Sequence, residues 1–317
     1  MEFRTLARPL ERLQGTVSHA APVLLVGSCF SDNIGAELRA DLFDAVVNPF
    51  GPLYNPLSVE SAFGIIATND GRYDARLFRH EGVWHDWNFH SRFSSASAPE
   101  AARAMGRSVA AAREALASAS AVIITLGTTT AYRLCEDDSV VANCHKMPAR
   151  MFRQTDLSLA ETTESLDRTI GIVRTVNPGA KIIFTVSPLR YLADGMHANT
   201  LIKSRLHLAI DAVSRSHEGI IYFPAYEIVN DDLRDYRFYA DDMKHPSAQA
   251  VRYIYDLFSQ SFFTPQTAET AAAGRRLSRR LSHRAMAVSE TEIKELDLLR
   301  QYPQLRNGYK RFIENEL

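Results

Sequence analysis

Five short apolar runs alternate along this chain with longer stretches that favour helix. The runs cover residues 23–27, 45–47, 121–126, 181–186 and 219–223, and helical apolar spacing occupies 99–119, 158–176 and 202–217. Strands that alternate with helices pair in parallel through right-handed crossovers. The pattern therefore predicts an α/β fold with a doubly wound, five-strand parallel sheet in the flavodoxin-like order.

The composition indicates a folded globular chain whose net charge is too small to attract a highly charged partner. Of the 317 residues, 46% are hydrophobic and 23% are charged, and the formal net charge is -1. This balance, without aromatic residues interleaved among basic ones, excludes nucleic acid as an expected partner. Three cysteines without CxxC spacing argue against a disulfide framework and a structural zinc site. We therefore expect neither a metal nor a cofactor, and a reducing compartment.

Targeting and membrane signals are missing from the sequence. The first residues, MEFRTLARPLERL, carry charges of both signs and no continuous apolar region. No run of about 18 apolar residues occurs. We expect a cytoplasmic protein with no integral membrane contact, and the sequence gives no indication of an oligomeric state.

Two segments fall outside the alternation. Residues 70–93 are rich in aromatic residues and histidine and predict a hairpin or lid, built either as a packed apolar cluster or as a substrate contact. Residues 264–317 predict a C-terminal extension with helices over 268–283 and 290–302. Its basic run at 275–284 fits a solvated helix face or a binding patch. We therefore expect a catalytic domain over 1–263 followed by a helical extension.

Ser28 is the first candidate catalytic residue, because it directly follows the apolar strand VLLVG. Ligands bind beyond the carboxyl ends of strands in open α/β sheets. Ser31 and Asp32 are good helix caps and 34–42 has helical spacing, which places Ser28 in a strand-to-helix turn near free N–H groups. Cys29 is a rival nucleophile, since a helix N-terminus lowers a thiol pKa. The alternative is a tight turn that needs small residues.

The segment YADDMKHPS at 239–247 supplies a candidate base and its orienting acid. In a turn, the i, i+3 spacing of Asp242 and His245 lets the carboxylate reach the imidazole, as a serine nucleophile requires. Pro246 keeps His245 out of a regular helix. Asp241 is the neighbouring alternative, which the spacing disfavours, and a surface carboxylate–histidine pair is the simpler explanation.

Three more polar residues follow predicted strands on the side where the site should lie. His145, Lys146 and Arg190 are candidate contacts to a polar or anionic substrate. Each also has an ordinary explanation as an anchor that holds a loop through a salt bridge.

Several motifs in order give the chain a resemblance to a known family. They are GSCF at 27–30, NPFGPLYNP at 48–56, LGTTTAY at 126–132, NCHK at 143–146, TVSPLRY at 185–191 and YRFYADDMKHPS at 236–247. Through them the chain, up to about residue 263, resembles GSCFA-domain proteins, a branch of the SGNH or GDSL-like hydrolases. The resemblance implies a three-layer α/β/α fold and hydrolysis of esters.

The same resemblance implies roles for individual residues. Ser28 matches the nucleophile, in preference to Cys29 because the nucleophile directly follows the glycine, while His245 matches the base and Asp242 its orienting acid. Gly51 matches the glycine whose N–H lines the oxyanion hole, and the N–H of Ser28 would be a second donor.

One departure concerns the third oxyanion donor. Where the superfamily has Gly-x-Asn, this chain has Gly127, Thr128 and Thr129. Thr129 can donate through its hydroxyl, and Asn143 through its amide if its loop folds back. We favour Asn143 slightly, because an amide reproduces the original donor, although a turn-forming role fits Asn143 equally well.

Together these features predict a serine-dependent esterase that acts on a small-molecule or carbohydrate acyl ester, such as an acetyl ester. An acyltransferase with the same triad is one alternative. A catalytically weak binding or scaffold protein is another, because losing one oxyanion donor costs about 100- to 1000-fold in turnover.

Overall fold

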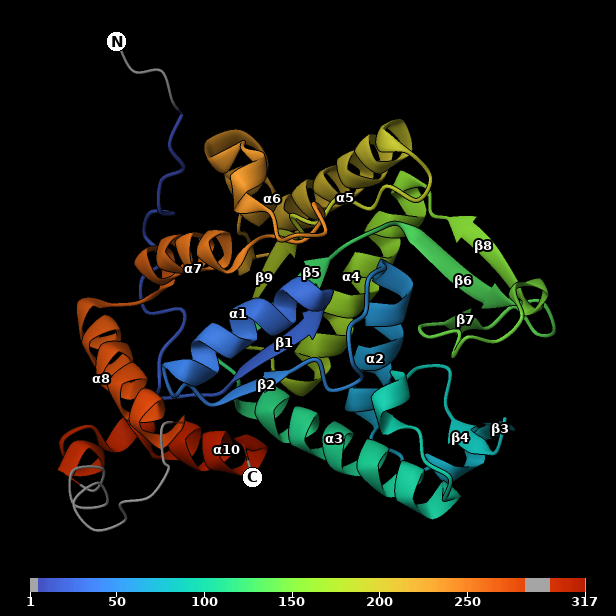
Figure 1. The fold of residues 1–317 in the computed structure, drawn as a ribbon, viewed down its shortest axis with the longest axis horizontal. Coiled ribbons are helices and arrows are strands. Elements are labelled where there is room, and N and C mark those ends of the chain that lie inside the picture. Colours follow the sequence, from blue (N-terminus) through green and yellow to red (C-terminus); the bar gives the residue numbers. More distant parts are fainter. Residues whose placement is uncertain (1–4, 283–296, 317) are drawn as a thin grey trace.

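The computed structural model describes residues 5–282 and 297–316 and is built around one parallel sheet (Figure 1). Its strands are β1 (Val23–Gly27), β2 (Ala45–Val47), β5 (Ala121–Leu126), β9 (Lys181–Val186) and β10 (Ile220–Tyr222). They pair in the order β10-β9-β5-β1-β2, with every pair parallel. Renumbered along the chain this is the order 2-1-3-4-5, so the predicted flavodoxin-like sheet is confirmed.

Helices cover both faces of the sheet, which gives the three expected layers. One face carries α1 (Cys29–Ala40) and α7 (Ala248–Phe262), and the other carries α2 (Pro56–Thr68), α3 (Ala98–Ser118), α4 (Leu159–Val176) and α5 (Met196–Ser216). Strand β1 shows how its side chains contact the helices on both faces. Val23 and Leu25 pack towards α1 and α7, whereas Leu24 and Val26 pack towards the opposite helices. Alternation along a strand therefore splits the core into two apolar clusters.

Two small antiparallel sheets decorate this core. The predicted hairpin is present as β3 (Phe78–His80) and β4 (Val83–His85). A second sheet, which the sequence did not predict, joins β6 (Thr130–Leu134) to β7 (Val140–Val141) and β8 (Phe152–Asp156). Strand β8 reads FRQTD and has no buried residue, so it lacks the apolar run that marks the central strands.

Short helical turns connect the larger elements. They are the 3-10 turns at Asp74–Arg76, Ser91–Phe93, Ala149–Met151, Tyr236–Phe238 and Pro303–Leu305, the helix α6 (Ala225–Glu227) and the π-helical turn at Ile228–Leu233. None of the described helices is both long enough and apolar enough to cross a membrane.

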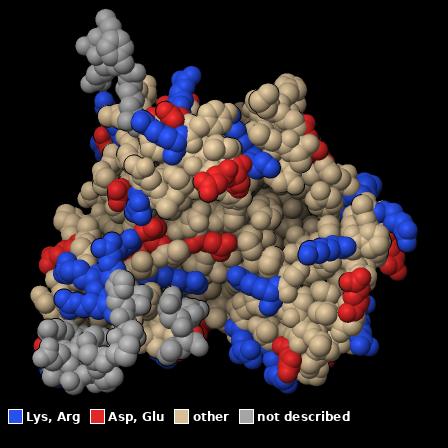
Figure 2. Space-filling view, in the orientation of Figure 1, with Lys and Arg blue, Asp and Glu red and all other residues tan. Residues whose placement is uncertain are grey.

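The C-terminal part packs against the turn after α1. Helix α8 (Pro265–Ser282) and helix α10 (Arg306–Glu316) meet this turn around the buried side chain of Leu42. Arg275 of the basic run pairs with Glu37 at 2.5 Å and also with Asp41, so this residue does not belong to a solvated helix face. Blue side chains gather over α8 in Figure 2. The helix expected at 290–302 lies largely outside the described residues.

Candidate active site

Ser28 lies at the junction of β1 and α1 and is 1% exposed. Gly27, with φ +150°, lies so close to Thr125 that a Cβ on Gly27 would overlap the Thr125 carbonyl. The chain turns there at once, and Ser28 itself caps α1 by accepting the Phe30 N–H at 3.3 Å. The expected caps, Ser31 and Asp32, were therefore wrong by one turn. The hydroxyl of the candidate nucleophile is the cap.

The residues expected as caps brace this turn instead. Ser31 donates to Thr125 Oγ1 at 2.8 Å, and Asp32 accepts the Asn48 amide at 2.8 Å. Asn48 in turn accepts the Gly27 N–H at 2.9 Å through Oδ1. Burial raises the pKa of Asp32, against the opposing effect of the Asn48 amide. Strand β5, the first turn of α1 and the loop at Asn48 thus fix the backbone on either side of Ser28.

Asp242 and His245 form a pair within one loop before α7. His245 Nδ1 lies 2.5 Å from Asp242 Oδ2, and Asp242 Oδ1 accepts the His245 N–H at 2.9 Å. These contacts hold the pKa of Asp242 well below its usual range. The loop is closed by a bridge between Tyr239 and Pro246. Both predicted partners are therefore brought together, and His245 Nε2 has no hydrogen-bond partner among the described residues.

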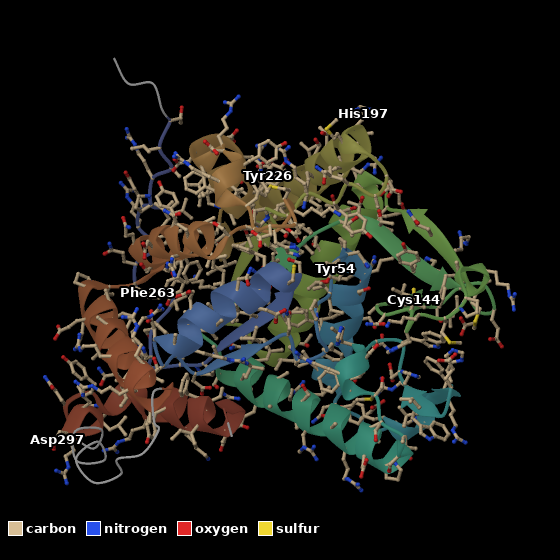
Figure 3. All side chains as sticks on the ribbon, viewed as in Figure 1. Tyr54, Cys144, His197, Tyr226, Phe263 and Asp297 are labelled. Atoms are coloured by element: carbon tan, nitrogen blue, oxygen red, sulfur yellow. The ribbon has the colours of Figure 1, made fainter. Side chains whose placement is uncertain are left out.

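No hydrogen bond joins Ser28 to His245 in the described residues, although the segments that carry them meet one apolar cluster. Phe238 and Tyr239, just before the Asp242 loop, pack against the same apolar cluster as Phe30. Figure 2 shows a hollow near the centre of the molecule, between α1, α2 and β6. Tyr54, at the start of α2, borders this region in Figure 3.

The two backbone donors expected for an oxyanion hole already have acceptors. Gly51, in the left-handed region with φ +86°, donates its N–H to Asn48 O at 2.8 Å. The Ser28 N–H donates to Thr125 O at 3.0 Å. The Cys29 N–H opens α1 and has no carbonyl acceptor among the described residues.

Of the two candidates for the third donor, Thr129 is engaged through its hydroxyl, and Asn143 through its side-chain oxygen and its backbone N–H. Thr129 is fully buried and donates its hydroxyl to Asp156 Oδ1 at 2.5 Å. Asn143 accepts the His145 N–H at 2.9 Å through its side-chain oxygen and donates its own N–H to Trp87 O at 3.1 Å. The turn-forming role of Asn143 is therefore present in the structure.

The three candidate substrate contacts are placed differently from one another. His145 is buried, with Nε2 2.8 Å from Asp86 O and Nδ1 3.1 Å from Ser91 Oγ, and burial lowers its pKa to about 4. Lys146 is exposed. Arg190 donates twice to Asn230 Oδ1, at 3.1 and 2.8 Å.

The aromatic hairpin forms a packed cluster around His145. Trp87 stacks on Phe78 with ring centroids 3.8 Å apart, and His145 lies 4.5 Å from His85 by the same measure. These contacts fit the packing interpretation of residues 70–93.

The charges of Asp32 and Lys203 act in opposite directions on the pKa of the Cys29 thiol. Burial, followed by the negative charge of Asp32, raises the thiol pKa. A thiol with a raised pKa stays protonated near neutral pH and is a poor nucleophile. Cys29 is therefore a weaker rival to Ser28 than its position at a helix N-terminus indicates.

Sequence reasoning missed Lys203 of α5, whose ammonium lies at the carboxyl ends of β5 and β9. Its side chain is 2% exposed, and Nζ donates to Gly127 O at 2.8 Å and Ser187 O at 2.9 Å. The signal was present, because Lys203 falls in the apolar stripe of α5 beside Ile202 and Leu206.

Residues 22–258 match the GSCFA family. The chain belongs to this family. A comparison with curated proteins gives no match. Similar solved structures include a carbohydrate esterase family 3 from Talaromyces cellulolyticus, 8% identical with a TM-score of 0.37, over 80% of this chain and 98% of that chain. A serine-to-alanine mutant of an acetyl esterase with an acetate ion is 9% identical, with a TM-score of 0.36 over the same shares.

The GSCFA match includes every candidate site residue, from Ser28 to His245, together with Lys203. It ends within α7 and leaves out α8 and α10. Within residues 5–282 and 297–316, no group of three or more histidine, cysteine or acidic side chains is arranged to hold a metal ion.

Proposed function

We propose that this GSCFA protein is a serine-dependent acyl-ester hydrolase. The observation that carries the proposal is the pairing of His245 with Asp242. The carboxylate holds Nδ1 and so leaves Nε2 as the basic nitrogen. A histidine oriented in this way can take a proton from a hydroxyl and stabilise the cation that results.

In the proposed reaction, Ser28 Oγ attacks the ester carbonyl while His245 Nε2 takes the hydroxyl proton. The carbonyl electron pair moves onto oxygen, and the collapse of this oxyanion expels the alcohol, which receives the proton from His245. Water then repeats the sequence on the acyl-enzyme and releases the acid. The proposed substrates carry a small acyl group, such as acetyl, on a carbohydrate or another polar carrier.

The reaction requires Ser28 and His245 to come into hydrogen-bond contact when substrate is bound. Catalytic hydrogen bonds are often long in unliganded structures and shorten in the substrate complex. The half-exposed side chains of Asp242 and His245 leave their loop room for this adjustment.

The backbone part of the oxyanion hole is proposed to lie at the start of α1. The Cys29 N–H is available there without losing a carbonyl acceptor. Gly51 and Ser28 are the donors that the family resemblance implies. Each would first have to release its present acceptor, Asn48 O for Gly51 and Thr125 O for Ser28.

A serine-reactive fluorophosphonate and p-nitrophenyl acetate test this proposal together. We expect the native protein to be labelled and to hydrolyse the ester, Ser28→Ala to lose both properties, and Cys29→Ala to keep both. Labelling that survives Ser28→Ala and disappears in Cys29→Ala would overturn the assignment of the nucleophile.

The occupied donors favour one second candidate, a binding protein with little turnover. The backbone N–H groups of Gly51 and Ser28 both donate to backbone carbonyls, which leaves fewer donors for an oxyanion. Absence of labelling in the native protein, together with measurable affinity for an acetylated sugar, would support this second candidate.

A further inference from the structure

Lys203 brings a buried positive charge close to the candidate nucleophile. Its ammonium is held by the carbonyl oxygens of Gly127 and Ser187, the residues that directly follow β5 and β9. A lysine ammonium has three N–H donors, so one donor is left over. Among the described residues, no carboxylate pairs with Lys203.

Burying this ammonium without a carboxylate partner costs free energy. Removing an ammonium from water without a counter-ion is strongly unfavourable, and two carbonyl dipoles compensate in part. Burial accordingly lowers the pKa of Lys203 to about 7.

Within residues 5–282 and 297–316, few ionisable groups lie near the Lys203 ammonium. They are the Cys29 thiol at the start of α1, and Tyr226 on α6, whose ring centroid lies 5.7 Å from Nζ. On its own helix, His207 is one turn further on and is turned towards Glu227, at 3.3 Å.

Gly127 connects Lys203 to Ser28. While its carbonyl accepts from Lys203, its N–H donates to Tyr54 O at 2.8 Å. A Cβ on Gly127 would lie 3.7 Å from Ser28 Cβ, so this peptide unit is packed directly beside the candidate nucleophile. A shift of the Lys203 ammonium would therefore move the Gly127 peptide unit that packs beside Ser28.

We propose that Lys203 is a positioning residue of this site, which holds the Gly127 turn against Ser28 and supplies the positive field that stabilises the anion formed there. This inference rests on the proposed function. It also fits the engagement of the Thr129 hydroxyl with Asp156, because a buried cation partly replaces the missing amide donor. A fixed charge in a site shielded from water is more effective than the same charge in water.

The anion in question arises when Ser28 adds to a carbonyl. The Oγ–C bond forms, the carbonyl electron pair becomes a negative charge on oxygen, and the serine proton passes to His245. An alkylboronic acid reproduces this charge without turnover, because its boron accepts the serine oxygen and becomes a tetrahedral anion.

The test measures the affinity of a small alkylboronic acid by calorimetry from pH 6 to pH 9. Lys203→Gln retains a side-chain N–H donor for the carbonyls and removes the charge, whereas Lys203→Met removes both. Arg215→Met is the matched control, since it removes one exposed positive charge from the same helix. Circular dichroism and thermal unfolding confirm that each variant is folded.

We expect both Lys203 variants to bind the boronic acid about 10- to 100-fold more weakly, somewhat less than the effect of losing a direct oxyanion donor. The native affinity should also fall as the pH rises through the range in which Lys203 loses its proton, and this dependence should be missing in Lys203→Gln. Arg215→Met should match the native protein.

Three outcomes separate the inference from the proposed function. Native-like affinity and pH dependence in Lys203→Gln would overturn the role of the charge. Weak binding in Lys203→Met that Lys203→Gln fully restores would reduce Lys203 to a structural hydrogen-bond donor and also overturn it. A native protein that neither binds the boronic acid nor reacts with fluorophosphonate would overturn the proposed function, and the inference with it.

Discussion

His245 Nδ1 lies 2.5 Å from Asp242 Oδ2, and the same carboxylate accepts the backbone N–H groups of His245 and Lys244. The pKa of Asp242 is lowered by these contacts, so the carboxylate stays ionised throughout the neutral range. Because this folded-state pKa lies below that of the unfolded chain, the pairing stabilises the fold above the usual aspartate range. That stabilisation is lost as the pH falls through the folded-state pKa.

Asp242→Asn should disable the pair without disturbing the loop. The amide retains the shape of the side chain but favours the wrong tautomer of His245, and comparable triads lose about 10,000-fold in kcat. Rates of p-nitrophenyl acetate hydrolysis provide the measurement. Asp241→Asn is the matched control and should stay within about threefold of the native rate, because the adjacent carboxylate does not contact the imidazole. Equal losses in the two variants would contradict the assignment of Asp242.

Gly27→Ala should destabilise the protein by about 3 kcal/mol or more, because the added methyl group would overlap the Thr125 carbonyl of the adjacent strand. Urea unfolding monitored by circular dichroism measures the change. Gly64→Ala is the control: Gly64 lies in α2 with open space around it, and the change should stabilise by about 0.5–1 kcal/mol. Native stability in Gly27→Ala would show that β1 and β5 are further apart than described.

Thr129→Val should act on stability more than on turnover. The hydroxyl is committed to Asp156, so its loss should cost about 1–3 kcal/mol in the free energy of unfolding. The value of kcat should fall by less than the 100- to 1000-fold expected for an oxyanion donor. Thr129→Ser keeps the hydroxyl and should retain most of the stability. A loss of several hundredfold in kcat at native stability would instead return Thr129 to the oxyanion hole.

His19 should make the fold sensitive to mild acid. Its ring stacks on Phe43, with centroids 3.7 Å apart, and burial lowers its pKa to about 4. Between the ordinary histidine value and that folded value, the unfolded chain binds a proton that the folded protein does not. The free energy of unfolding should therefore fall by up to about 3 kcal/mol as the pH drops from about 6.5 to 4.

Urea titrations at several pH values measure this loss, which should largely disappear in His19→Gln. The exposed His197 provides the control, so His197→Gln should retain the native pH dependence. An unchanged slope in His19→Gln would assign the acid sensitivity to other groups.

The centre of the sheet could be predicted from sequence because β1, β5 and most of β9 are buried on both faces. Residues 121–126 and 181–186 read as continuous apolar runs, and their order along the chain follows from right-handed crossovers. Asp242 and His245 were equally accessible to prediction, since their contact is local.

The remainder depends on contacts between distant parts of the chain. Strand β8 carries mostly charged and polar side chains and has no buried residue, so no apolar pattern marks it. Whether the N–H of Ser28 is free depends on Thr125, which lies on another strand. The buried ammonium of Lys203 depends on the carbonyls of Ser187 and Gly127, which precede it by 16 and 76 residues. Short-range patterns carry no information about such partners.

The close fit of the C-terminal helices against the turn at Leu42 has a consequence for dissecting this protein. Gly274 of α8 and Gly308 of α10 press directly on the backbone at Asp41 and Leu42, where any side chain would collide. A chain truncated after residue 258, where the family match ends, would expose the side chain of Leu42. It would also remove Arg275, the ion-pair partner of Asp41. The unit defined by sequence similarity is therefore shorter than the packed unit, and α1, which presents Ser28 at its other end, would lose its contacts with α8 and α10 in such a truncation.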